Sequence, residues 1–513
     1  MSSTESAVAE RPELGAIREH MLIDGKPVRQ GGGAPIAVHD PATGETIAEQ
    51  VDAGAEQVDL AVRAARRAFE DPAWRDMLPV MRERLLLRLA DLVEQHADEL
   101  ARLETLNNGK LLALSHGLEV GAGAQWLRYM AGWATKIHGD TLSLSIPFPP
   151  GVSYQAYTRP EPVGVVAAII PWNFPLLMAI WKIAPALATG CTVVLKPAEE
   201  TPLTALRLGE LVMEAGFPPG VVNVITGRGE SAGAALVAHP GIDKIAFTGS
   251  TEVGKQIGRI AMGEVKRVSL ELGGKSPVIV LDDCDVARAV QGAAGAIFFN
   301  QGQVCTAGSR LFVQRALYDQ VTAGLAEAAA GMTLGSGFDE STQIGPMVSA
   351  RHCSRVLDYI KLGKAEGARV LAGGQAAERP GYFVQPTVFA DAPAGARIAR
   401  EEIFGPVVVA QAFDTLDEAV QLANDSSYGL GASIWSNDLN RVQRLIPRIK
   451  AGTVWVNTHN MLDPAMPFGG FKQSGVGREH GRAAIEMYLE TKSVCIAYEQ
   501  SGNRQKDEEG TDR

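Results

Sequence analysis

Short apolar runs alternate with helical patterns along much of the chain. Apolar, β-branched runs that predict strands occur at residues 163–170, 192–195, 221–225, 244–247 and 268–272. The stretches between them have the apolar spacing of helices. This alternation predicts a parallel sheet covered by helices on both faces, with ligand sites at the carboxyl ends of the strands. A nucleotide is the expected ligand of such a sheet.

A second series with the same alternation begins near Pro277. It contains the apolar run PVIVL, a helix that starts at Asp285, the run SRLFVQ and a helix that starts at Tyr318, and it continues to about Phe471. We therefore expect a second α/β domain.

Three further elements follow from local patterns. Leucines spaced about 3.6 residues apart predict one amphipathic surface helix that begins at Pro79 and ends before Gly109. These leucines are Leu85, Leu89, Leu92, Leu100 and Leu103. Residues 141–159 alternate around PFPPG and predict a hairpin arm, and TKSVCIAY at 491–498 predicts another strand. The tail at 501–513 has no apolar residue, and we expect it to be disordered.

The composition is that of an ordinary folded, soluble protein. The 513 residues are 46% hydrophobic and 21% charged, and at ~150 residues per domain they predict about three domains or subdomains. The 48 basic and 59 acidic residues give a net charge of −11. An acidic chain gains nothing from counterion release, so no nucleic-acid partner is expected. Residues 163–181 carry no charge, but Pro171, Asn173 and Pro175 interrupt them, and no membrane span is expected.

The cysteines and the N-terminus favour a reducing, cytoplasmic setting. The five cysteines are odd in number and widely spaced without a C-x-x-C pair, so they indicate neither a disulfide framework nor a zinc site. The first 15 residues lack the basic and apolar regions of a secretory signal. None of the nine histidines belongs to an H-E-x-x-H pattern, and we expect no catalytic metal.

Three residues are candidate catalytic groups. Cys305 lies in a glycine-containing stretch between a helix and a strand, where backbone amides can approach a ligand; the other cysteines are expected to be inert small hydrophobes. Asn173, in the turn PWNFP, offers its side-chain amide to an oxyanion or belongs to a simple tight connection. Glu271, within VSLELGG, is either a buried carboxyl with a raised pKa, suited to a general base, or a residue on the exposed face of a half-buried strand.

Two glycine clusters follow predicted strands and open helices. They are GRGESAG at 227–233 and FTGSTEVG at 247–254. This is the context of a phosphate-binding turn, but neither cluster has the full G-x-G-x-x-G pattern, and ordinary strand-to-helix turns also contain glycine. Taken alone, these turns leave both interpretations open.

Seven stretches occur in the order that is typical of the aldehyde dehydrogenase superfamily, and the resemblance extends over residues 21–498. The stretches are PWNFP, KPAEETP, FTGSTEVG, LELGGKSP, FNQGQVCTAGSR, EEIFGPV and PFGGFKQSGVGRE. The resemblance implies an aldehyde dehydrogenase-like α/β fold that assembles as a dimer or tetramer. Its implied parts are a Rossmann-type NAD-binding domain (1–140 and 161–273), an α/β catalytic domain (274–475) and a β-arm for oligomerisation (141–160 and 487–500).

The resemblance also implies catalytic roles. Cys305 is implied as the nucleophile, its own amide and the Asn173 side chain as the oxyanion hole, and Glu271 as the base. The implied reaction is attack on an aldehyde, hydride transfer to NAD and hydrolysis of the thioester to a carboxylic acid. Lys182 and Glu479 match positions that relay protons away from the base, and a solvated surface role is the alternative for both.

Further positions match the family's cofactor site. Lys196 and Glu199 correspond to residues that hold the adenosine ribose, Ser250 to one that touches the pyrophosphate, and Glu402 and Phe404 to residues at the nicotinamide ribose. The other implied NAD contacts are Ile169, Pro171, Trp172, Gly229, Phe247, Gly249 and Leu272. A carboxylate at position 199 accepts hydrogen bonds from both ribose hydroxyls and repels a 2′-phosphate, so NAD is expected rather than NADP.

Within the superfamily, residues 146–159, 457–470 and 491–498 are most similar to the bacterial phenylacetaldehyde dehydrogenases. Only 457–470 is expected to line the aldehyde tunnel, which would be apolar, rich in aromatic residues and suited to an aryl-alkyl aldehyde. Its expected lining is Phe174, Trp181, Val304, Thr306, Asn460, Leu462 and Phe468. The alternatives are a dehydrogenase for a medium-chain aliphatic aldehyde or an aminoaldehyde, and a catalytically retired structural or binding protein on the same fold.

Overall fold

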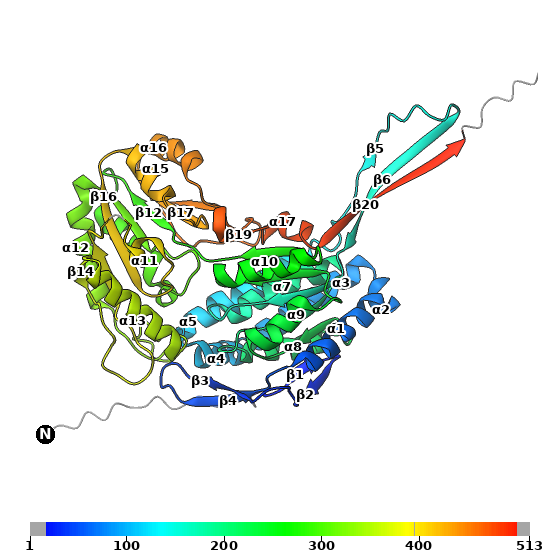
Figure 1. Ribbon diagram of the computed structural model, residues 1–513, viewed down its shortest axis with the longest axis horizontal. Helices are drawn as coiled ribbons and strands as arrows, with labels where there is room; N and C mark the ends of the chain where they lie inside the picture. The colour runs from blue at the N-terminus through cyan, green and yellow to red at the C-terminus, as the bar shows by residue number, and fades with distance from the viewer. Residues whose placement is uncertain (1–16, 394, 500–513) are drawn as a thin grey trace, which may run out of the picture.

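The computed structural model describes residues 17–393 and 395–499. They form a body with two sheets and a long, narrow arm that projects from it (Figure 1). The predicted tail at 501–513 and the stretch examined for a secretory signal lie outside the described residues.

The larger sheet has eight strands in the order β19-β11-β10-β7-β8-β9-β1-β2. Its five central strands are parallel and confirm the first predicted series. They are β7 (Val165–Ile169), β8 (Thr192–Lys196), β9 (Val222–Val224), β10 (Lys244–Thr248) and β11 (Arg267–Glu271). Three short edge strands, which the sequence patterns did not predict, pair antiparallel: β1 (Met21–Ile23), β2 (Lys26–Val28) and β19 (Gly475–Val476).

Helices cover both faces of this sheet, which explains the unbroken apolar runs of its strands. Val165, Ala167 and Ile169 of β7 pack into one hydrophobic cluster with α1 (Ala55–Glu70), α9 (Ala234–Ala238) and α10 (Thr251–Gly263). Val166 and Ala168 point to the opposite face. There they pack with α3 (Pro79–Gln95), α6 (Ala122–Ala131), α7 (Pro175–Thr189) and α8 (Leu203–Ala215).

The single helix predicted from Pro79 to Gly109 is wrong. Two helices occupy this range, α3 and α4 (Ala97–Asn108), and they meet at His96, whose backbone leaves the helical conformation at φ −99° and ψ 23°. Nδ1 of His96 lies 3.0 Å from the Glu99 carboxylate and 3.2 Å from the Arg207 guanidinium, so polar contacts surround the break. Gly109 ends α4 in the left-handed conformation, as its position after the leucines predicted.

Four shorter helical elements complete this part of the chain: α2 (Pro72–Arg75), α5 (Leu112–Leu114), the π-helix η1 (Ser115–Gly121) and the π-helix η2 (Gly229–Gly233). A separate antiparallel pair consists of β3 (Ile36–His39) and β4 (Thr46–Gln50).

The second sheet confirms the second α/β series and forms its own lobe, on the left in Figure 1. Its seven strands run in the order β14-β15-β16-β13-β12-β17-β18, and every neighbouring pair except β14–β15 is parallel. The strands are β12 (Pro277–Val280), β13 (Arg310–Gln314), β14 (Arg369–Ala372), β15 (Thr387–Ala390), β16 (Val407–Phe413), β17 (Gly431–Trp435) and β18 (Thr453–Val456).

The helices of this lobe begin close to their predicted positions. Asp285 caps α11 (Val286–Phe298) by accepting a hydrogen bond from the Arg288 amide, and the helix predicted from Tyr318 starts three residues earlier, as α12 (Arg315–Gly331). The remaining helical elements here and at the C-terminal side are η3 (Phe299–Gly302), α13 (Ala350–Ala365), α14 (Arg397–Arg400), α15 (Leu416–Asn424), α16 (Leu439–Leu445), η4 (Ile446–Arg448), η5 (Lys472–Ser474) and α17 (Gly481–Glu486).

The arm is a three-stranded antiparallel sheet in the order β20-β6-β5. Its strands are β5 (Thr141–Leu142), β6 (Val152–Pro162) and β20 (Leu489–Glu499), and they confirm both the predicted hairpin and the predicted C-terminal strand. The uncharged run 163–181 is divided between β7 and α7 by a turn. Among the described residues, no helix combines the length and the apolar character needed to cross a membrane.

Candidate active site

The turn PWNFP joins the carboxyl end of β7 to α7, and Pro175 occupies the first helical position, where a missing N–H costs nothing. Asn173, in the middle of this turn, is 3% exposed. Its Nδ2 donates to the backbone oxygen of Gln303 at 3.0 Å, and its own backbone oxygen accepts from Asn300 Nδ2 at 3.2 Å. The turn is therefore bonded directly to the loop that carries Cys305.

The Cys305 loop follows α11 through an unusual backbone. Asn300 and Gln301 have φ values of 46° and 58°, and Gly302 has φ 69°. A Cβ on Gly302 would lie 2.1 Å from the backbone oxygen of Gly405, so only glycine fits. On the other side, a Cβ on Gly274 would lie 2.2 Å from the Cys305 backbone oxygen. These close approaches hold the Cys305 backbone between the two sheets.

Cys305 is partly buried, and its thiol is protonated at neutral pH. Burial, with smaller contributions from the Glu402 and Glu271 carboxylates, raises the pKa of the thiol to about 12, and the amides of Thr306 and Cys305 oppose this rise. A nucleophilic thiolate therefore requires a base or a positively charged neighbour. The other cysteines do not share this loop: Cys191 and Cys284 are buried, Cys353 is partly buried, and Cys495 is exposed on the arm.

Glu271, the last residue of β11, is 5% exposed, and neither carboxylate oxygen has a hydrogen-bond partner. The structure thus favours the buried alternative over an exposed strand face. Burial, followed by the nearby Glu479 charge, raises the pKa of Glu271 well above its ordinary value, while Lys182 and Arg478 act in the opposite direction. Gly469 allows this fit, because a Cβ there would lie 2.8 Å from Oε1 of Glu271.

Lys182 and Glu479 form a buried ion pair between α7 and the segment after β19. Their side chains are 0% and 6% exposed, which excludes the solvated surface role. Oε2 of Glu479 has no hydrogen-bond partner and is free to accept a proton or bind water.

The adenosine-side candidates gather at the carboxyl ends of the central strands. Lys196 ends β8, and its Nζ lies 3.8 Å from the Glu199 carboxylate, which also accepts a hydrogen bond from the Gly229 amide. Ser250 caps α10 just after β10, its Oγ accepting from the Val253 amide at 3.3 Å. The other predicted contacts in these turns, and at the ends of β7, β10 and β11, are Ile169, Pro171, Trp172, Phe247, Gly249 and Leu272.

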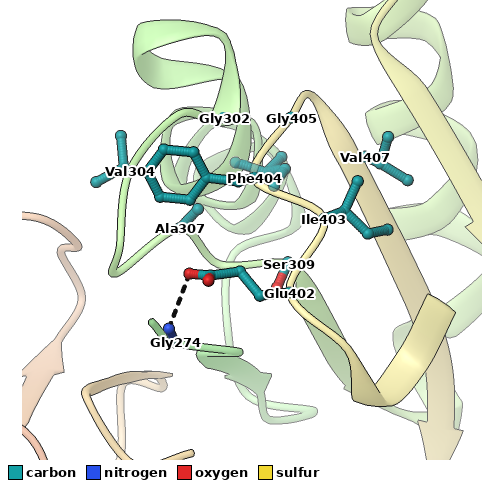
Figure 2. A pocket seen from close by; sticks show the side chains of 11 residues that line it. Gly274, Gly302, Val304, Ala307, Ser309, Glu402, Ile403, Phe404, Gly405 and Val407 are labelled. Atoms are coloured by element: carbon teal, nitrogen blue, oxygen red, sulfur yellow. Dashed lines mark hydrogen bonds between the residues drawn. The ribbon is translucent and has the colours of Figure 1, made fainter. Parts of the chain in front are cut away.

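Glu402 and Phe404 come from the second lobe, and the Glu402 carboxylate points toward Gly274 (Figure 2). Oε1 of Glu402 accepts a hydrogen bond from the Gly274 amide at 2.9 Å, and burial raises the pKa of Glu402 to about 7. The Phe404 ring packs edge-on against Trp172, with 5.2 Å between ring centroids. The two predicted cofactor residues therefore lie beside the turns of the larger sheet, around a small cavity that Val304 also lines.

Most of the predicted tunnel residues belong to the hydrophobic cluster against which Cys305 packs. Phe174, Trp181, Val304 and Phe468 share one buried hydrophobic cluster, and Leu462 and Cys305 pack against it. Trp181 and Phe468 have ring centroids 6.0 Å apart. Next to them, Thr306 Oγ1 donates to Oδ1 of Asn460 at 2.7 Å, although the Asn460 Nδ2 has no partner.

Three residues of this region were missed from the sequence. The backbone oxygen of Gln303 accepts a hydrogen bond from Asn173 Nδ2. Its position two residues before Cys305 could have indicated that it belongs to the site. The His480 ring meets Trp181 edge-on, with 4.1 Å between centroids, and stacks on Phe468 at 5.6 Å, and burial lowers the pKa of its ring to about 3. Lys110 contacts the Asn173 backbone, and no sequence signal indicates it. Among the described residues, no group of three or more His, Cys, Asp or Glu side chains is arranged to hold a metal ion.

Comparisons with known protein families, sequences and structures identify the family of this chain. The sequence profile of the Aldehyde dehydrogenase family matches residues 28–494. A phenylacetaldehyde dehydrogenase from Pseudomonas fluorescens is 59% identical over 95% of this chain and 98% of its own length, and the putative aldehyde dehydrogenase DhaS from Bacillus subtilis is 52% identical over 93% and 96%. The structure of an aldehyde dehydrogenase from Bacillus cereus in complex with NAD+ is 49% identical, covers 93% of this chain and 96% of its own, and has a TM-score of 0.90. The chain belongs to the aldehyde dehydrogenase family.

Proposed function

We propose that this aldehyde dehydrogenase uses NAD to oxidise phenylacetaldehyde, or a similar aryl-alkyl aldehyde, to the carboxylic acid. The observation that carries the proposal is the meeting of a thiol, an amide donor and a buried carboxyl, from Cys305, Asn173 and Glu271, beside an aromatic cluster. The 59% identity to the phenylacetaldehyde dehydrogenase supports the choice of substrate.

In the first step, the Cys305 thiol loses its proton to solvent, the sulfur adds to the aldehyde carbon, and the carbonyl π electrons move to oxygen. Asn173 has two amide N–H groups, and Gln303 uses one of them, so the other is available to the oxyanion. The Cys305 amide is the second donor of the proposed oxyanion hole. Such donors stabilise charge that develops in the transition state, and each contributes roughly 10²- to 10³-fold in rate.

The residues at the crevice suit NAD. The Glu199 carboxylate beside the Lys196 ammonium matches a ribose diol, the α10 N-terminus after Ser250 matches a pyrophosphate, and Glu402 with Phe404 would hold the nicotinamide ribose. Thr248 Oγ1, at the end of β10, is buried and has no hydrogen-bond partner in the protein, so it could form a hydrogen bond with a bound ligand. When bound, NAD would supply the acceptor for the hydride that leaves the thiohemiacetal carbon.

Glu271 then removes a proton from a water molecule, the water oxygen adds to the thioester carbon, and the Cys305 sulfur leaves with the C–S electron pair. The Lys182–Glu479 pair would carry the proton away from Glu271. In total, aldehyde, water and NAD+ give carboxylic acid, NADH and one proton.

Replacing Glu199 by Gln is expected to weaken the discrimination against NADP. The side chain keeps its shape but no longer repels a 2′-phosphate, so the ratio of kcat/KM for NADP to that for NAD should rise about tenfold or more. Initial rates with each cofactor at saturating aldehyde measure this ratio. A wild-type enzyme that prefers NADP at equal concentration would disprove the role of Glu199.

Substrate profiling tests the proposed aldehyde. Phenylacetaldehyde should give a higher kcat/KM than acetaldehyde, betaine aldehyde or succinate semialdehyde, because the cluster around Trp181 and Phe468 offers aromatic contact. NADH absorbance on mixing enzyme, NAD and aldehyde is the measurement. A clear preference for a charged or medium-chain aliphatic aldehyde would overturn the substrate, and no NADH with any aldehyde would support the retired-protein alternative.

We further propose that the chain divides into the NAD-binding, catalytic and oligomerisation parts that the resemblance implies. In this division, the arm joins subunits of a dimer or tetramer. The arm exposes large apolar side chains, among them Phe148 at 70% and Tyr498 at 51%. Exposed apolar surface on a narrow sheet is typical of an interface between chains. Light scattering of the wild-type protein measures the assembly.

A further inference from the structure

We infer that Lys110 and Glu119 form a positioning pair that fixes the turn carrying Asn173, so that its amide faces the Cys305 loop. The inference rests on the proposed oxyanion role of Asn173. Neither residue is itself an expected substrate or cofactor contact, and both lie in the segment between α4 and α6.

The Lys110 ammonium lies inside the protein, with its side chain 1% exposed. Its Nζ donates to the Asn173 backbone oxygen at 2.8 Å, pairs with the Glu119 carboxylate and lies 3.5 Å from the Glu104 carboxyl. Two of the three N–H donors of the ammonium are thus used in hydrogen bonds, to Glu119 and to the Asn173 backbone, and the Glu104 contact is an ion-pair distance without a hydrogen bond. Nζ also lies 4.5 Å from the centroid of the Phe174 ring, so the same charge contacts two consecutive residues of the turn.

Glu119 holds the other end of the turn. Its second oxygen, Oε2, accepts a hydrogen bond from the Leu177 amide at 2.8 Å, in the first turn of α7. No side chain caps this helix at Phe174, so the Glu119 carboxylate satisfies one of the free N–H groups there and suits the positive end of the helix dipole. One ion pair therefore ties down both sides of Asn173.

The neighbouring backbone directs Lys110 inward. Gly109 is left-handed at φ 86°, and a Cβ there would lie 2.6 Å from Pro346 and 2.8 Å from Pro41, so the chain turns sharply after α4. Just before it, Asn108 Nδ2 donates to the Trp172 backbone oxygen at 2.7 Å. The end of α4 thus contacts successive carbonyl groups of the turn.

A buried ion pair is a poor source of stability, because desolvation of the two charges offsets much of their attraction, whereas it does fix geometry. Burial, followed by the nearby Glu119 charge, also raises the pKa of Glu104 to about 8, which favours the neutral form of this carboxyl beside the Lys110–Glu119 pair. The pair therefore serves to orient the turn: the Lys110 ammonium fixes the position of the Asn173 carbonyl, and the Glu119 carboxylate fixes that of the Leu177 amide.

The test is a double-mutant cycle on the pre-steady-state NADH burst. Lys110→Met should slow the burst about tenfold in the enzyme with Asn173, while the affinity for NAD, measured by fluorescence titration, stays the same. In the Asn173→Ala background the same change should slow the burst less than about twofold further, because the group that Lys110 positions is gone. If Lys110→Met does not fold, the double change Lys110→Met with Glu119→Gln leaves no unpaired charge and takes its place in both backgrounds.

Lys266→Met is the matched control. Lys266 is also buried, at 6% exposure, but donates to the backbone oxygens of Val237 and His239 away from the turn, so its loss should lower thermal stability without slowing the burst. An equal slowing in both Asn173 backgrounds, or none in either, overturns the inference alone. A burst of wild-type rate in Asn173→Ala overturns the proposed oxyanion hole, and the inference with it.

Discussion

Replacing Cys305 by Ala is expected to abolish both the NADH burst and steady turnover, with a loss of about a thousandfold or more. Without the sulfur no thiohemiacetal forms, and the aldehyde carbon has no alkoxide to expel a hydride. Stopped-flow absorbance of NADH after mixing enzyme, NAD and phenylacetaldehyde measures both phases. Binding of NAD should remain, since no predicted cofactor contact uses this side chain.

Cys305→Ser is a stringent control because it preserves size and polarity but has a much poorer nucleophile. It should be almost as inactive as the Ala variant. Cys353→Ala, which removes another partly buried thiol, should keep wild-type turnover. Steady turnover in Cys305→Ala, or an acyl adduct found by mass spectrometry on another side chain, would contradict the covalent mechanism.

Much of the fold could be predicted because buried parallel strands leave an unambiguous sequence pattern. The runs at β7 and β8 are apolar at every position, since helices cover both of their sides. The edge strands β1, β2 and β19 were not predicted, as segments of two or three residues have no measurable period. Likewise, the break at His96 affects one residue, and the leucines on either side of it keep a helical spacing.

The residues of the candidate site likewise include some that the sequence could predict and some that it could not. Cys305, Asn173 and Glu271 could be proposed because each lies in a distinctive stretch, but the burial of Glu271 could not, since one strand pattern fits both a buried and an exposed carboxyl. Lys110 and Glu119 were missed for a physical reason: charged residues nine positions apart near a helix end resemble a solvated surface. Only the three-dimensional contact with the turn reveals their burial.

The pKa directions of Cys305 and Glu271 constrain the order of proton transfers. Burial raises the pKa of both groups and favours their neutral forms before substrate binds. The carboxyl is still the more acidic group of the two in water, so Glu271 in its ionised form is the available acceptor for a proton from the hydrolytic water. Activity should therefore depend on the ionised fraction of Glu271.

Replacing Glu271 by Gln is expected to separate the two halves of the reaction. Acylation needs the sulfur, the oxyanion donors and bound NAD, so a burst of about one NADH per active thiol should remain. Hydrolysis needs a base for the water, and its loss should lower steady turnover by roughly 10²- to 10⁴-fold. The phenylacetyl thioester on Cys305 should then accumulate, and mass spectrometry of the quenched enzyme would detect it.

The pH profile supplies the decisive comparison. A carboxyl is a base only above its pKa, so wild-type steady turnover should rise with pH toward the raised pKa of Glu271 and fall as acid protonates it. In Glu271→Gln this rising limb should disappear, because the amide does not titrate. The same limb in both enzymes would assign it to another group, and wild-type turnover in the Gln variant without thioester accumulation would show that a different base activates the water. Because the variant keeps the size of the side chain beside Gly469, a change confined to the second half of the reaction reflects lost basicity and not a collapsed site.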